Sequence, residues 1–134
     1  MGSSTEAITI VLPIPPVAVR PNGRAQWRAK AKAVKAMRDR AYAYTLVELC
    51  GDTPPGWTSA SVLIDWYHST KRLMDRDNII ASCKAYIDGI ADAGLIADDV
   101  GVAYEPVGRF VDPKHPRVEI TITPTETITP TGER

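Results

Sequence analysis

Alternating apolar and polar positions predict a strand in the middle of the chain, at residues 61–70, SVLIDWYHST. A two-residue period is typical of a strand, because successive side chains point to opposite faces. The stretch 7–12, AITIVL, is rich in β-branched residues and predicts another strand. In the middle strand, one face carries Val62, Ile64, Trp66 and His68, and the other carries Leu63, Asp65 and Tyr67.

Two more strands are predicted later in the chain, at residues 100–110 (VGVAYEPVGRF) and 116–123 (PRVEITIT). The short segment VDPKH between them predicts a hairpin turn. His115 falls in this turn and His68 on a strand face, and we interpret both histidines as non-functional.

A helical period predicts two helices. Residues 25–50 are rich in Ala, which has the highest helix propensity, and Gly51 is a plausible stop. Residues 78–93, NIIASCKAYIDGIADA, predict the second helix, which ends before Gly94. Apolar residues recur at helical spacing in both segments. The first stripe consists of Val34, Met37, Ala41, Tyr44 and Leu46 or Leu49, and the second of Ile79, Cys83, Ile87 and Ile90.

The order of these elements, β-α-β-α-β-β, predicts an α+β fold in which two helices cover a mixed sheet. One domain is expected to span residues 1–123. The segment 13–24 contains four prolines and a glycine, so we expect a long loop without regular structure. Residues 124–134 contain two prolines and almost no large apolar residue, and we expect a disordered tail.

Composition places the chain among ordinary globular proteins, with 134 residues and a net charge of zero. No apolar run approaches the roughly 20 residues of a membrane span, and the N-terminus lacks the pattern of a signal peptide. Cys50 and Cys83 have no metal-ligand spacing and are expected to be reduced thiols. We therefore expect a cytoplasmic protein without a membrane partner. Trp27, Trp57 and Trp66 are candidates for either core or interface.

The zero net charge hides a segregation of charge along the chain. Residues 20–40 are strongly basic, with Asp39 as the only acid, whereas residues 75–105 are acidic. A basic segment beside an acidic one suits a polyanion that also meets a metal site, although solvated surface faces would give the same pattern.

The stretch 71–78, KRLMDRDN, places two aspartates two residues apart, just before the second predicted helix. One interpretation is helix capping by Asp75 or Asp77. The other is a metal site, because carboxylate oxygens suit Mg²⁺ or Mn²⁺. If a single helix begins at Asp77, Lys84 and Asp88 each lie about 20° from it around the axis. Both interpretations remain open from these residues alone.

A second acidic pair, Asp98 and Asp99, follows the helix. Adjacent residues of an extended chain face opposite ways, so only one of the two would reach a shared site. The return of the chain after the helix could bring that residue back to residues 75–77.

Together these residues are more specific than their parts. Residues 75–99, DRDNIIASCKAYIDGIADAGLIADD, resemble the signature of the RusA family of Holliday-junction resolvases, which are common in phages and prophages. That signature runs Asp-x-Asp-Asn, a helix with Lys and Asp-Gly or Asp-Ala, and a Gly-containing turn into Asp-Asp. The segments LPIPP and RVEITIT and the basic helix extend a looser likeness over about residues 8–123.

Two departures from the family pattern concern the helix and the loop before it. In the best-known form of the motif, the lysine comes one turn after the second aspartate, where this chain has Ala81. Here Lys84 comes three residues later, and Asp88 is delayed equally, which is nearly one helical turn. Of the Ser and Asn that often follow the family's prolines, only Asn22 remains.

The resemblance implies a homodimeric, Mg²⁺-dependent endonuclease of the bacterial host cytoplasm, which introduces paired nicks into four-way DNA junctions. It places the catalytic, metal-binding aspartates at Asp75, Asp77 and Asp99, and the essential lysine at Lys84. Asp98 and Asp88 would not bind the metal; they would hold the metal-binding and catalytic side chains in position. The cations expected to hold DNA are Arg20, Arg24, Arg28, Lys30, Lys32, Lys35, Lys71, Arg72 and Arg76.

Three other hypotheses remain open. A non-catalytic protein that binds branched DNA would need the basic helix but not the carboxylates. A metal nuclease for flaps or forks would share the site and differ in its substrate. In a purely structural protein, the aspartates would only cap the helix.

Overall fold

A nine-residue strand, β2 (Ala60–His68), lies at the centre of the sheet, and its residues alternate between buried and half-buried along its whole length. In this computed structural model, which describes residues 7–20, 26–97 and 102–125, β2 pairs on one side with the antiparallel strand β5 (Arg117–Pro124). β1 (Ile8–Leu12) pairs with the far side of β5, also antiparallel. The strands predicted at residues 7–12 and 61–70 are therefore confirmed to within two residues.

Two short strands share the other edge of β2. β3 (Val102–Tyr104) pairs with its first residues and β4 (Gly108–Val111) with its last, both parallel to β2. The predicted hairpin is therefore wrong, because β2 lies between β4 and β5. A parallel pair needs a long crossover connection, and the helices between β2 and β3 provide it.

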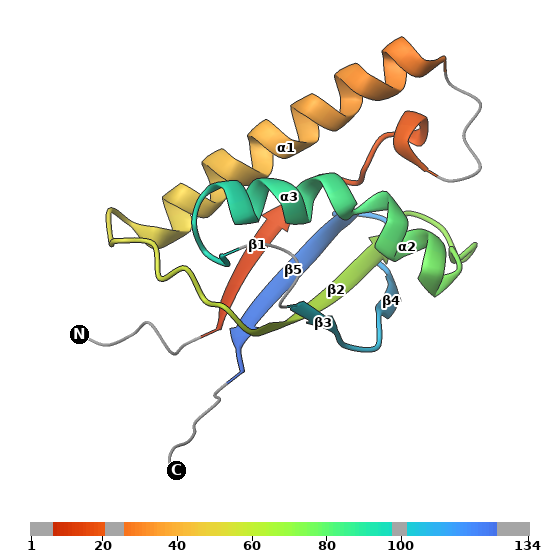
Figure 1. Ribbon diagram of the computed structural model, residues 1–134. Helices are drawn as coiled ribbons and strands as arrows, with labels where there is room; N and C mark the ends of the chain where they lie inside the picture. Colours follow the sequence, from red (N-terminus) through yellow and green to blue (C-terminus); the bar gives the residue numbers. More distant parts are fainter. Residues whose placement is uncertain (1–6, 21–25, 98–101, 126–134) are drawn as a thin grey trace.

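Three α-helices cover one face of this mixed sheet in a single α+β domain (Figure 1). α1 (Trp27–Leu49) is the longest, and α2 (Arg76–Ser82) and α3 (Lys84–Asp92) follow β2. The first helix thus agrees with the prediction to within two residues. Among the described residues, no helix is long and apolar enough to cross a lipid bilayer.

The second predicted helix, residues 78–93, is two helices instead of one. The break lies at Cys83, whose backbone (φ −98°, ψ 3°) is not helical and whose side chain is fully buried. Burial raises the pKa of this thiol. Both cysteines are free, as expected, and Cys50 is exposed. The second helix segment does end where predicted, because Gly94 adopts a positive φ of 92°.

Apolar side chains from the sheet and the helices form one core, in which Ile10, Ile64 and Ile120 are fully buried. On α1, the predicted stripe is confirmed at Met37, Ala41 and Leu49, which recur every four residues. Thr45 completes this buried row. Tyr44 and Leu46 therefore flank the row and are about 40% exposed, at 41% and 39%.

The packing of α1 against α3 depends on Gly89. A Cβ atom at this position would lie 2.2 Å from the backbone oxygen of Arg38 and 2.9 Å from the Cβ of Ala41. The helices are also joined by a two-pronged ion pair between Arg38 and Asp92, with N–O distances of 2.5 and 2.9 Å. The hydrogen bond from Arg38 lowers the pKa of Asp92.

The proline-rich loop is fixed by hydrogen bonds to its backbone. The Tyr86 hydroxyl of α3 donates to the Pro13 carbonyl (2.7 Å), and the Arg20 guanidinium donates to the Pro15 carbonyl. Contrary to the prediction, the loop contains regular structure, a single turn of 3₁₀ helix at Val17–Val19. Pro16 precedes this turn as its N-cap residue, with extended backbone (φ −64°, ψ 155°).

The sheet face turned away from the helices carries polar and aromatic side chains. The Tyr67 and Phe110 rings stack with centroids 4.9 Å apart, and the Arg117 guanidinium lies 3.9 Å from the Tyr67 centroid. Arg117 also forms ion pairs with Asp112 and Glu119. At the C-terminal end, β5 includes Pro124, the first residue of the predicted tail, and residues 126–134 lie outside the described part of the chain.

Candidate active site

The two aspartates of the Asp-x-Asp-Asn segment lie at the start of α2. Asp75 is the N-cap residue, with extended backbone, and Asp77 lies in the first helical turn. Both are exposed. Although Asp75 occupies the capping position, its carboxylate accepts no capping hydrogen bond. Capping therefore does not account for the Asp75 side chain, which is exposed and lies two residues before the exposed Asp77.

The segment that leads to Asp75 is held by His68, a buried residue at the end of β2. Its Nδ1 atom lies 3.0 Å from the Phe110 carbonyl oxygen, and its Nε2 atom accepts a 3.0 Å hydrogen bond from the Met74 N–H. This pattern requires the neutral tautomer with a proton on Nδ1. His68 is thus a positioning residue for the chain immediately before Asp75, a role that the sequence interpretation missed.

Arg109, on β4, reaches the same segment. Its Nη1 atom donates a 3.3 Å hydrogen bond to the Met74 carbonyl. Its Nε atom is buried and has no hydrogen-bond partner among the residues that the structure describes. The sequence offered only a weak signal for Arg109, a lone cation within a strand, because its contact depends on the parallel pairing of β4 with β2.

Removal of the His68 hydrogen bonds should destabilise the protein. We expect His68→Leu to lower the free energy of unfolding by about 1–3 kcal/mol, since it removes two part-buried hydrogen bonds, to the Met74 N–H and the Phe110 carbonyl. Urea unfolding measures the loss, and amide hydrogen exchange at Met74 should accelerate. His115→Leu is the control, because His115 is exposed, and we expect a change within about 0.5 kcal/mol. Equal stabilities would contradict the role of His68.

Lys84 and Asp88 lie on α3 and form an ion pair with each other, at 2.6 Å. Because the helix is interrupted at Cys83, the single-helix geometry that placed them on one stripe with Asp77 does not apply. The structure brings Lys84 to Asp88, and Asp77 belongs to a separate helix.

The second acidic pair, Asp98 and Asp99, lies outside the described residues. The residues on either side of it are described. Ala97 N–H donates to the carbonyl of Trp57, just before β2 (2.8 Å), and Val102 pairs with Ala60, the first residue of β2. Asp75 follows the opposite end of β2, where α2 begins (Figure 1). The expected convergence of Asp99 with Asp75 and Asp77 therefore stays a prediction. Within the described ranges, no group of three or more potential ligands is placed to hold a metal ion.

A cavity of about 180 Å³ lies beside this segment, with Met74 in its wall. Arg20, Arg72, Ser69 and Thr70 also line it, and none of its lining residues within the described ranges is acidic. Arg20 is held by two hydrogen bonds to Pro15 and lies 5.7 Å from the ring centroid of buried Trp66. Such a cavity suits a phosphate group, which guanidinium groups and hydroxyls bind well.

The other predicted DNA-binding cations have separate positions. Lys71 and Arg76 are exposed around the start of α2, whereas Lys35 forms an ion pair with Asp39 at 2.9 Å. Arg24 lies outside the described residues. Arg28, Lys30 and Lys32 are exposed on the first turns of α1.

Comparison with known proteins identifies a relative of this chain. No family model matches the sequence. An uncharacterized protein of Xylella fastidiosa is 34% identical over 127 residues, which cover 89% of this chain and 71% of that protein. The chain belongs to the same family as this Xylella protein. Because the Xylella protein has no described activity, the function proposed below rests on the residues of this chain.

Proposed function

We propose that this protein is a metal-dependent endonuclease that cuts branched DNA, with the four-way junction as its substrate. The observation that supports this proposal is the pair of exposed aspartates, Asp75 and Asp77, at the start of α2. Three exposed cations, Lys71, Arg72 and Arg76, lie next to them in the sequence. Asp75 makes no capping hydrogen bond that would explain its side chain. The adjacent cavity with Arg20 and Arg72 would hold a backbone phosphate next to the scissile bond.

The donor atoms fit the proposed ion. Carboxylate oxygens are the ligands that Mg²⁺ prefers, and Mn²⁺ accepts the same set. Asp75 and Asp77, with Asp99, would hold the ion, which when bound lowers the pKa of a water molecule and neutralises charge at the phosphate.

The remaining steps belong to side chains of the protein. His68 and Arg109 hold the Met74 backbone, and thereby position the chain immediately before Asp75. Lys84 forms an ion pair with Asp88 in this structure. In the complex with DNA, the lysine would contact a phosphate oxygen, and Asp88 would hold the lysine in position. The exposed cations of α1 would hold the arms of the junction through their phosphates, so binding should weaken strongly with salt.

A homodimer would match the two-fold symmetry of a four-way junction, with one site in each subunit and paired nicks as the product. The substrate implies a location in the cytoplasm of a bacterial host. Shape more than base sequence would select the DNA, because phosphate contacts carry no direct sequence information.

Incubation of an end-labelled four-way junction with the protein tests this proposal. We expect symmetric nicks in two opposing strands when Mg²⁺ or Mn²⁺ is present, and intact strands when EDTA is added. Matched duplex DNA is the control and should remain uncut. Equal cutting with and without EDTA would contradict the requirement for a metal.

One observation favours a non-catalytic DNA-binding protein. Asp98 and Asp99 lie between Ala97 and Val102 in the sequence. Ala97 contacts Trp57, just before β2, and Val102 pairs with the first residue of β2, whereas Asp75 follows the other end of that strand. Tight junction binding without cleavage in either metal would support that alternative. A panel of flaps and forks distinguishes the third hypothesis, since a flap or fork nuclease would cut these substrates in preference to the junction.

A further inference from the structure

The three tryptophans have different environments, and only one is conspicuously exposed. Trp66 is 2% exposed within the core and Trp57 is half-buried, whereas Trp27, the first residue of α1, is 73% exposed. A single exposed apolar side chain is common in proteins and needs no functional explanation. A functional role for Trp27 therefore has to be argued from the groups around it.

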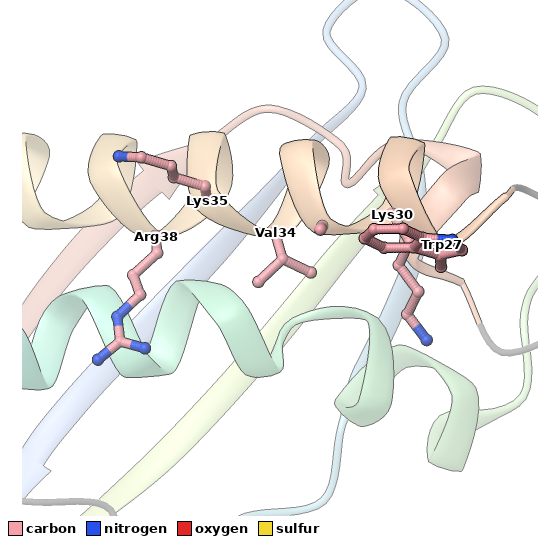
Figure 2. Close-up of a pocket in the computed structure, with 6 residues that line it drawn as sticks. Trp27, Lys30, Val34, Lys35 and Arg38 are labelled. Atoms are coloured by element: carbon pink, nitrogen blue, oxygen red, sulfur yellow. The ribbon is translucent and has the colours of Figure 1, made fainter.

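A groove of about 520 Å³ runs along α1 from this ring. Figure 2 shows the Trp27 ring at one end of the groove, Val34 pointing towards the α3 side and the Lys30 amino group directed towards α2. The Arg28 guanidinium lies 5.4 Å from the Trp27 ring centroid. Within the described part of the chain, the residues that line the groove include no acid; they are Trp27, Lys30, Ala31, Val34, Lys35 and Arg38.

The cations near Trp27 are not equivalent. Lys35 and Arg38 already form ion pairs with Asp39 and Asp92. Arg28 and Lys30 are exposed beside the ring, on the first turn of α1. The end of the groove near Trp27 thus combines a flat apolar surface with two positive charges.

This combination fits a nucleobase attached to phosphates. A base stacks on an aromatic ring, and its flanking phosphates pair with nearby cations, as in proteins that bind single strands. A second copy of the chain fits less well. A two-fold contact through this turn would bring the same cations of the two copies together, and like charges repel at such distances.

We propose that Trp27 stacks on an unpaired base of a bound DNA strand, while Arg28 and Lys30 contact the adjacent phosphates. This inference rests on the proposed function, because the branch point of a junction is where bases lose their stacking partners. In this proposal, the first turn of α1 recognises the branch point. The other exposed cations bind the duplex arms.

Binding of the full-length protein to a four-way junction in EDTA tests this assignment without cleavage. The junction carries 2-aminopurine, a fluorescent base, either at the branch point or within an arm. We expect wild-type protein to quench the probe at the branch point only. Trp27→Ala should abolish this quenching and weaken binding about tenfold, whereas Trp27→Phe should retain most of both. Tyr42→Ala, at another exposed aromatic residue of α1, is the control and should behave as wild type.

Two results would overturn the assignment. One is unchanged affinity and quenching in a folded Trp27→Ala variant, as judged by circular dichroism. The other is a change of molecular mass in light scattering with unaltered DNA binding, which would identify a contact between copies of the chain. Failure of the nuclease proposal gives a different result, because quenching that depends on Trp27 would persist in a protein that never cuts.

Discussion

Asp77→Asn is expected to bind four-way junctions with near wild-type affinity but to lose at least about a hundredfold of its Mg²⁺-dependent cleavage rate. Stabilisation of charge by a bound metal ion contributes several kcal/mol to such reactions, and about 1.4 kcal/mol corresponds to tenfold in rate. Asparagine keeps the size and one oxygen of the side chain but removes the negative charge that attracts the cation. Single-turnover cleavage of a labelled junction measures the rate, and a gel-shift assay in EDTA measures binding.

The matched control for this variant is Asp52→Asn. Asp52 is an exposed aspartate in the loop after α1, far along the chain from the candidate site, and should retain full cleavage. If the aspartates at α2 serve only the helix, Asp77→Asn would instead cost up to about 1 kcal/mol of stability through the helix dipole and leave cleavage unchanged. Full cleavage by this variant would reject the assignment of Asp77.

Gly89→Ala should lower the free energy of unfolding by about 1–3 kcal/mol, the usual cost of overpacking a tight contact. The added Cβ would lie 2.2 Å from the Arg38 carbonyl oxygen, and a backbone atom cannot move aside as a flexible side chain can. α1 would have to shift away from α3, which would also strain the Arg38–Asp92 ion pair. Urea unfolding with fluorescence detection measures the change.

The intrinsic helix propensities predict the opposite sign, because alanine is favoured over glycine by about 1 kcal/mol inside a helix. Ala81→Gly supplies the comparison, since Ala81 is an exposed position within α2. We expect alanine to be the more stable residue at position 81 and glycine at position 89. A Gly89→Ala variant that is more stable than wild type would contradict the close approach of α1 and α3.

Much of the fold was predictable, because local periodicity determines most of its elements. The alternation in β2 and the four-residue row on α1 are local properties of the sequence. The pairing of strands was not local. The five residues between β4 and β5 suited a hairpin, yet both strands pair with β2, one on each edge. The break at Cys83 was hidden for the same reason, since no glycine or proline marks it and the burial of its side chain depends on the core.

The candidate site shows the same division. The Asp-x-Asp-Asn segment was recognisable in the sequence, and it lies at the start of a helix as predicted. The residues that hold this segment, His68 and Arg109, were not recognisable, because their contacts with Met74 join positions that lie 6 and 35 residues apart. The expected angle between Asp77 and Lys84 stays a prediction, because it assumed one unbroken helix and the chain has a break at Cys83.

The contact at Gly89 fixes α1 to α3 near Arg38, and the helix continues from there to Trp27. At about 1.5 Å per residue, this part of α1 is about 16 Å long. The number of residues in this part of α1 therefore sets the distance between Trp27 and the contact at Gly89. Insertion of one residue within this segment would turn the ring by about 100° around the helix axis. The exposed side chains of this segment can therefore vary between relatives, but a change in its length would turn Trp27 in a different direction.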